Sequence, residues 1–323
     1  MAITGIDAVT FGVTDMKTAL RFCSDWGLVR QNAQTLAAAS LPRGSALFHC
    51  ADGSAVQLVP AQSGTLPTAI EAGNTVRQVI WGVQSRRDLQ ALASNLGRDR
   101  DVAFDSDGTL HSVDDIGVGI GFRVSQRKKL KAAPSQFNTP GCAVRIDARA
   151  PRYLRAVPQE ISHIVFGVKD IRPVERFYRQ RLGFLLSDRY IGRSVFLRAT
   201  PAGNHHHLFI MNTANHSNQF NHLSFKVRDI HEVIGGGQFI SQRGWTTQAG
   251  PGRHLPSSAC FWYFKSPLGG AFEYAADEDV VTAKWKPASM RMDPTLFSEW
   301  RFNAGNGMRG APMADSRIAR SKR

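Results

Sequence analysis

The chain has 323 residues, of which 42% are hydrophobic, and this length and composition suffice for two globular domains. No apolar run approaches the roughly 18 residues of a membrane-spanning helix, and the first residues lack the charged and apolar regions of a signal peptide, so neither a membrane protein nor an exported one is expected. The formal net charge is +14, but no helix-turn-helix, zinc-finger or RNA-stacking motif accompanies it, so nucleic acid is not an expected partner.

Four similar units follow one another along the chain, and each begins with a short apolar strand that leads into an amphipathic helix. The predicted strands cover residues 6–13, 78–83, 161–168 and 221–227, and the helical segments after them cover residues 19–28, 88–93, 174–184 and 229–233. The first and third units are clear copies of each other. Such a repeat predicts one supersecondary unit used four times.

The third and fourth units carry two histidines and a carboxylate. His163 and His222 lie in their first strands, and Glu273 lies in a later strand that follows a Ser-Pro-Leu-Gly turn. Alternation along these strands can turn all three side chains into one cavity. Two imidazoles and one carboxylate on one face of a metal ion leave positions open for substrate and O2, as in non-haem Fe(II) oxygenases.

The first two units lack these potential ligands. When the units are superimposed, Ala8 occupies the position of His163, and Gln78 occupies the position of His222. A lone histidine in a strand is more often a core or surface residue than a ligand. The shared fold alone does not explain histidines that only the second half carries, so we predict one metal ion per chain, in the C-terminal half.

The stretch from residue 252 to residue 274 is the most specific part of the sequence. It contains His254, then Tyr263 within an aromatic run, then a Pro-x-Gly turn and Glu273. Together with the four units, this stretch resembles the vicinal oxygen chelate (glyoxalase/bleomycin resistance) superfamily, and within it the two-domain type I extradiol ring-cleavage dioxygenases. The resemblance extends to about residue 285.

This resemblance implies an α+β fold in which four βαβββ modules form two half-open barrel domains, the vicinal oxygen chelate fold. The implied segments are an N-terminal domain without metal at 1–130, an interdomain linker at 131–158, a C-terminal catalytic metal-binding domain at 159–285 and a C-terminal extension with a basic tail at 286–323. The resemblance also implies that His163, His222 and Glu273 bind the metal, and that His254 and Tyr263 act on the substrate.

The family also has an acid/base histidine on the strand before the second ligand. This chain offers His205, His206 and His207 there, followed by an apolar strand. The family pattern favours His206, whereas the spacing back from His222 favours His207 almost as well, so both are candidates. A histidine can take and return a proton near neutral pH. Three consecutive histidines can also bind adventitious metal at the end of a loop, which is the expectation for His205.

The implied function is extradiol (meta) ring cleavage, in which both atoms of O2 enter a catechol or trihydroxybenzene-type aromatic during aromatic catabolism. The expected cofactor is Fe(II) in preference to Mn(II), with O2 as co-substrate. The alternative is a metal-dependent isomerase or lyase, or a ligand-binding protein, of the same superfamily. The acid/base histidine favours the dioxygenase, because a binding protein needs no proton transfer. Modules of this kind commonly associate, so a homo-oligomer is expected.

The four cysteines, Cys23, Cys50, Cys142 and Cys260, show no CxxC spacing. They are expected to be reduced thiols of a cytoplasmic protein. Basic residues gather in the linker and in the C-terminal tail, where we expect a solvated surface, with steering of anionic phenolates as the second interpretation.

Overall fold

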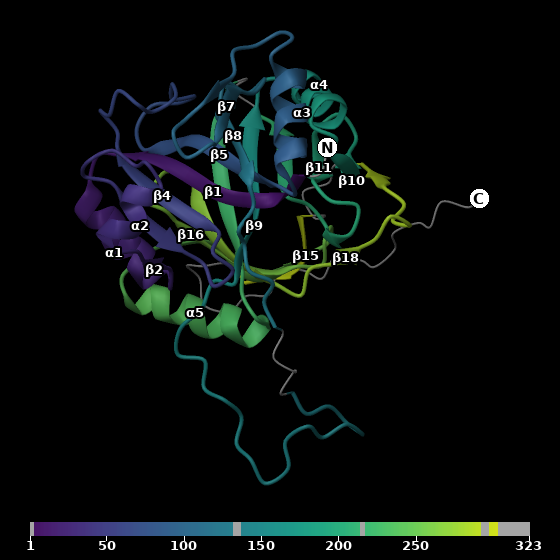
Figure 1. Cartoon of the computed structure of the whole chain (residues 1–323). Helices are drawn as coiled ribbons and strands as arrows, with labels where there is room; N and C mark the ends of the chain where they lie inside the picture. The colour runs from purple at the N-terminus through teal and green to yellow at the C-terminus, as the bar shows by residue number, and fades with distance from the viewer. Residues whose placement is uncertain (1–2, 132–136, 214–216, 292–296, 303–323) are drawn as a thin grey trace.

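The computed structural model describes residues 3–131, 137–213, 217–291 and 297–302, and it contains one large sheet from each half of the chain (Figure 1). The first half contributes β1 (Ile3–Val13), α1 (Met16–Asp25), β2 (Val29–Arg30), α2 (Ala33–Ala38), β3 (Ala46–His49), β4 (Ala55–Pro60), β5 (Thr75–Val83), α3 (Arg86–Leu96), β6 (Ala103–Phe104), β7 (Leu110–Val113) and β8 (Gly119–Val124). Its strands form an 8-stranded sheet in the order β2-β3-β4-β1-β5-β8-β7-β6.

The second half repeats this succession. It contributes β9 (Glu160–Val168), α4 (Ile171–Arg176), the π-helix η1 (Phe177–Arg181), β10 (Leu185–Tyr190), β11 (Ser194–Arg198), β12 (Gly203–Asn204), β13 (Leu208–Asn212), β14 (Gln219–Lys226), α5 (Ile230–Gln242), β15 (Thr247–His254), β16 (Cys260–Lys265), β17 (Ala271–Ala276), β18 (Val280–Val281), β19 (Ala288–Met290) and β20 (Ser298–Arg301). The order of its 10-stranded sheet is β19-β10-β11-β13-β9-β14-β17-β16-β15-β20, and β12 pairs with β18.

Both halves share one topology, and this confirms the predicted α+β fold of four βαβββ modules. In the first half, the opening strands of its two modules, β1 and β5, pair antiparallel, and the closing strands β4 and β8 lie parallel outside them. In the second half, β9 and β14 take the central places, and β13 and β17 take the outer ones. The central four strands of each sheet therefore correspond one to one.

The polar turns noted in the sequence explain where the module helices begin. Asp15, Ser85, Asp170 and Asp229 each precede a helix, and each side chain accepts a hydrogen bond from a backbone N–H of the first turn. Such N-caps satisfy donors that have no partner within the helix. The same capping device recurs in all four modules and fixes the change from strand to helix.

Buried contacts join the two halves. Trp26, which follows α1, stacks on Tyr274 of β17 with ring centroids 3.8 Å apart, and the Tyr274 hydroxyl donates to the Trp26 carbonyl oxygen at 2.7 Å. In the other direction, the hydroxyl of Tyr178 in η1 donates to Asp114 Oδ2 at 2.6 Å. The two halves therefore share a continuous core. Trp26 and Tyr178 each come from the helical segment of one half and pack or hydrogen-bond against the other half.

The C-terminal extension and the linker are described only in part. Two strands of the predicted C-terminal extension belong to the second sheet, because β19 pairs with β10 and β20 pairs with β15. The remainder of the predicted basic tail, residues 303–323, lies outside the described residues. Part of the connection between β8 and β9 extends away from the sheets near α5 (Figure 1).

None of the helices within the described ranges is long and apolar enough to span a membrane.

Candidate metal centre

Three neighbouring strands bring the predicted ligands together. His163 lies on β9, His222 on β14 and Glu273 on β17. Ser224 of β14 is the cross-strand partner of both His163 and Glu273, and His222 lies two positions before Ser224 on the same strand. Paired residues, and residues two apart on one strand, face the same side of a sheet. The register therefore turns all three side chains to one face.

The donor atoms of these three residues converge. His163 Nε2 lies 3.2 Å from His222 Nε2 and 3.3 Å from Glu273 Oε2, and His222 Nε2 lies 3.5 Å from the same carboxylate oxygen. Among the described residues they form the one group of three or more His, Cys, Asp or Glu side chains placed to hold a metal ion. Glu273 Oε2 is buried without a hydrogen-bond partner. A buried carboxylate oxygen that faces two imidazole nitrogens fits a divalent cation.

The two imidazoles differ in their electrostatic environment. Burial alone lowers the pKa of His163, but its contacts with Glu273 and Glu278 outweigh burial and raise that pKa to about 9. Burial lowers the pKa of His222 to about 3. Burial raises the pKa of Glu273, yet the contacts of its carboxylate with His163 and His254 hold that pKa well below its usual value. A cation bound between these groups would compete with a proton on His163.

A second layer of contacts orients the two rings. His163 Nδ1 lies 3.3 Å from Ser162 Oγ and 3.6 Å from Glu278 Oε1, and Ser162 Oγ donates to both oxygens of Glu278. His222 Nδ1 lies 2.7 Å from Asn221 Oδ1. These contacts direct Nε2 of each ring toward Glu273, as carboxylate and amide partners do in metal sites. Glu278 is not among the residues predicted from the sequence, where its one signal is an acidic residue shortly after the strand of Glu273.

The histidine run alternates between two environments. The His206 ring lies beside His163, with centroids 4.1 Å apart, and it lines the cavity next to the triad. His207 is buried, does not line that cavity, and its Nδ1 accepts from the backbone N–H of Ala199 at 3.2 Å. Burial, reinforced by the neighbouring histidines, lowers the pKa of His206 well below its usual value. Of the two candidates, His206 is therefore the one beside the triad.

His205 is fully buried, at 0% exposure, so the expectation of an adventitious site at the end of a loop is wrong. Its Nε2 lies 2.9 Å from Asp188 Oδ2, and its Nδ1 lies 3.2 Å from His206 Nδ1. When Asp188 accepts the Nε2 proton of a neutral His205, the Nδ1 of His205 must accept from His206. His206 then presents an Nε2 lone pair, which is the form of imidazole that can take a proton.

His254 and Tyr263 contact the carboxylate end of the triad. His254 Nε2 lies 2.9 Å from the Tyr263 hydroxyl and 3.4 Å from Glu273 Oε1, while its Nδ1 lies 3.0 Å from the Phe297 carbonyl oxygen. Burial raises the pKa of Tyr263 well above its usual value, which keeps its hydroxyl protonated. Both side chains therefore offer hydrogen bonds at the edge of the cavity.

The cavity in front of the triad has a volume of about 770 Å³. All the predicted site residues except Glu273 and His207 line it, and apolar walls come from side chains that include Val165, Phe209 and Met211. Polar side chains, among them Arg193 and Asn212, also line this cavity, so it can hold a ring-sized molecule that carries polar substituents.

Comparisons with known proteins identify similar sequences. Residues 160–274 match the family model described as the Glyoxalase/Bleomycin resistance protein/Dioxygenase superfamily. Metapyrocatechase 2 from Cupriavidus necator is 30% identical over 203 residues, which are 61% of this chain and 59% of that protein, so the match spans less than two thirds of the relative's length.

Two solved structures show the same fold. The Mn(II)-bound glyoxalase from Novosphingobium aromaticivorans has a TM-score of 0.72 and 22% identity, over 93% of this chain and 91% of that chain. The halotolerant catechol dioxygenase BphC has a TM-score of 0.69 and 18% identity, over 93% of this chain and 94% of that chain.

Proposed function

Residues 160–274 belong to the Glyoxalase/Bleomycin resistance protein/Dioxygenase superfamily, and on this premise we propose that the protein is an extradiol ring-cleaving dioxygenase. Its proposed substrates are a catechol or trihydroxybenzene-type aromatic and O2. The observation that carries the proposal is the position of His206, a histidine outside the ligand set, beside His163 in a ring-sized cavity. The similarity to a protein named metapyrocatechase and to a catechol dioxygenase supports it.

His163, His222 and Glu273 would hold the metal ion in this function. When bound, the metal would acidify an adjacent pair of ring hydroxyls and allow electron density to pass from the ring to O2. We favour Fe(II) over Mn(II), because two histidines with one carboxylate are the ligand set of non-haem iron oxygenases.

The protein's own contribution to the chemistry is proton handling. His206 would take the proton from one ring hydroxyl and return it as the ring opens. Asp188 and His205 hold His206 in the tautomer that can accept this proton, through the contacts at 2.9 and 3.2 Å. A neutral imidazole in a buried site needs no prior deprotonation to act as a base.

His254 and Tyr263 would position the substrate. Burial keeps the Tyr263 hydroxyl protonated, and His254 lies between this hydroxyl and the Phe297 carbonyl oxygen. When a neutral His254 donates its Nδ1 proton to Phe297, Tyr263 donates to His254 Nε2, and the Tyr263 oxygen can accept from a ring hydroxyl. Hydrogen-bond partners that are already oriented stabilise developing charge without reorganisation. The apolar side chains of the cavity, which include Val165 and Phe209, would contact the ring.

The second candidate is a metal-dependent isomerase or lyase, and the similarity to a Mn(II)-bound glyoxalase favours it. Such an enzyme would use the metal to polarise a carbonyl or enediol oxygen and would consume no O2. The two functions therefore differ in one measurable quantity, the O2 taken up per substrate molecule.

The deciding experiment is O2 uptake by full-length protein loaded anaerobically with Fe(II), tested against a panel of catechols and trihydroxybenzenes. We expect about one O2 per ring, both atoms of labelled O2 in the product, and cleavage beside the diol. Uptake of no O2 across the panel, with turnover of a glutathione adduct or an epimerisable acid, would establish the isomerase instead.

Light scattering on the same sample tests our further prediction of a homo-oligomer.

A further inference from the structure

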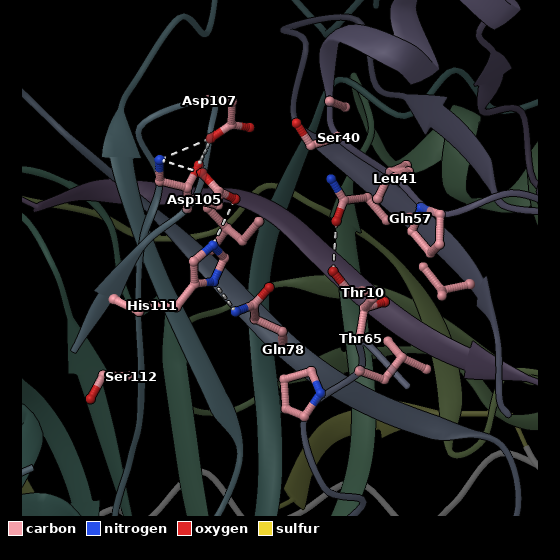
Figure 2. Close-up of a pocket in the computed structure, with 18 of the residues that line it drawn as sticks. Thr10, Ser40, Leu41, Gln57, Thr65, Gln78, Asp105, Asp107, His111 and Ser112 are labelled. Carbon is pink, nitrogen blue, oxygen red and sulfur yellow. Dashed lines mark hydrogen bonds and ion pairs between the residues drawn. The ribbon is translucent and has the colours of Figure 1, made fainter. Parts of the chain in front are cut away.

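The N-terminal half contains a second cavity, of about 710 Å³, in the place that corresponds to the metal centre (Figure 2). Strand register defines the correspondence. In the second half, Ser224 pairs with His163 and Glu273, and in the first half Ile80 pairs with Ala8 and Gly121. The positions of the three ligands are thus occupied by Ala8, Gln78 and Gly121, which cannot form a metal site of that kind.

Polar side chains in this cavity are nevertheless held in fixed orientations. His111 occupies the position of Tyr263, since His111 pairs with Gly121 as Tyr263 pairs with Glu273. Its Nε2 lies 2.8 Å from Asp105 Oδ2, and its Nδ1 lies 2.6 Å from Gln78 Nε2 (Figure 2).

This chain of contacts determines which way Gln78 points. With Asp105 accepting the Nε2 proton of a neutral His111, Nδ1 must accept from the Gln78 amide. The Gln78 carbonyl oxygen is then directed away from His111 (Figure 2), and within the described residues it has no hydrogen-bond donor.

Gln57 supplies a hydrogen-bond donor to the cavity, where Gln78 supplies an acceptor. Its Oε1 accepts from Thr10 Oγ1 at 2.6 Å, which leaves its NH₂ group without a partner among the residues that the structure describes. Gln57 is only 4% exposed and Gln78 only 8%. Both side chains line the cavity, where a ligand can reach the amide groups that have no partner in the described part of the chain. A cavity that presents a fixed amide donor and a fixed carbonyl acceptor is therefore complementary to a ligand that can accept and donate.

The remaining lining restricts the charge of that ligand. Apolar walls come from residues that include Leu41, Val59, Leu66 and Val102, and no lysine or arginine is found among the described lining residues. Asp101, Asp105 and Asp107 also line the cavity, so its fixed charge is negative. Carboxylates and phosphates would meet repulsion with no cation to pair with.

We propose that this N-terminal cavity is a second, metal-independent binding site for an uncharged phenol-sized molecule, whose hydroxyl donates to Gln78 and accepts from Gln57. Ligand binding here requires no metal and no O2. The proposal therefore stands independently of the proposed dioxygenase function.

The probe for this site is 4-fluorophenol, with 4-fluorobenzoate as an anion of similar size. Full-length metal-free protein is titrated near neutral pH and binding is followed by ¹⁹F NMR. Gln57→Leu and Gln78→Leu should each weaken phenol binding by roughly 2- to 12-fold, the effect of one lost neutral hydrogen bond. His222→Ala, which changes only the C-terminal cavity, should leave this binding unchanged, and 4-fluorobenzoate should bind more weakly than the phenol.

Wild-type methyl NMR keeps the test decisive even when a leucine variant fails to fold. Resonances of Val59 and Ile80, which line the N-terminal cavity, should shift with 4-fluorophenol. Shifts confined to Val165 and Met211, which line the C-terminal cavity, would overturn the proposal. So would unchanged affinity in both folded leucine variants, and binding of 4-fluorobenzoate as tight as that of the phenol would refute the charge argument.

Discussion

Glu278 Oε1 lies 3.6 Å from His163 Nδ1, on the side of the imidazole ring opposite the metal-facing nitrogen. The Glu278 side chain is only 2% exposed, and its second oxygen lies 3.3 Å from Lys226 Nζ. Burial raises the pKa of this carboxyl, but Lys226 and His163 outweigh burial and lower it to about 2. An ionised carboxylate therefore contacts the Nδ1 side of His163, a predicted ligand. There it can orient the imidazole ring and increase the basicity of the ring.

Glu278→Gln should lower metal affinity on the order of 10- to 100-fold, because the ring loses its charged partner. Glu160→Gln is the matched control: Glu160 also lies 3.3 Å from Lys226 Nζ, but it has no contact with His163 among the described residues. Chelator competition with Mn(II) or anaerobic Fe(II) measures both variants. Equal losses of metal affinity in the two variants would assign the effect to the contact with Lys226 and not to the contact with His163.

Replacing His163, His222 or Glu273 by alanine should remove metal and activity together. Each change deletes one of three donors, and even the loss of an outer contact costs about 10- to 100-fold in affinity. Elemental analysis should give one metal per wild-type chain and none in the variants, while His231→Ala, which removes an exposed histidine, should retain it. Wild-type metal content in all three variants would refute the triad.

His206→Phe should retain metal and bind catechol, yet lose about 10²- to 10⁴-fold in turnover, as expected when an acid/base group is missing. The informative comparison is His207→Phe, because the two residues are adjacent but occupy different environments. Single-turnover kinetics with matched metal loading measures both. Normal turnover in the His206→Phe variant, together with an inactive His207→Phe variant, would assign the acid/base role to His207.

Asp114 provides a test by pH, away from the metal centre. Burial raises the pKa of its carboxyl from 3.8 to about 6, although the Tyr178 hydroxyl and two backbone N–H groups act in the opposite direction. Between these values the folded state holds a proton that the unfolded state has released, so this group's contribution to the free energy of unfolding falls as pH rises.

Asp114→Asn removes that contribution. The stability of the variant relative to wild type should therefore increase from about pH 4 to about pH 7, by on the order of 1–3 kcal/mol. Urea unfolding at the two pH values measures the difference. A constant difference between the two proteins would show that the carboxyl titrates alike in the folded and unfolded states.

Local pattern was sufficient to identify the modules and the predicted ligands. Each module combines a strand of period two, a capping residue and an amphipathic helix, and these are properties of consecutive residues. The same holds for His163, His222 and Glu273, since each lies in a strand with its own turn signal. The absence of ligands in the first half was equally visible, because Ala8 and Gln78 occupy the corresponding positions.

The tertiary structure decided what depends on contacts between distant segments. His206 and His207 are neighbours in sequence, and only the pairing of β13, the strand that follows them, with β9 determines which of them lies beside His163. Glu278 and Asp188 act on histidines that lie 115 and 17 positions from them. The pairing of Gln78 with His111 depends in the same way on strand register, and register arises from packing of the whole sheet, which no local pattern records.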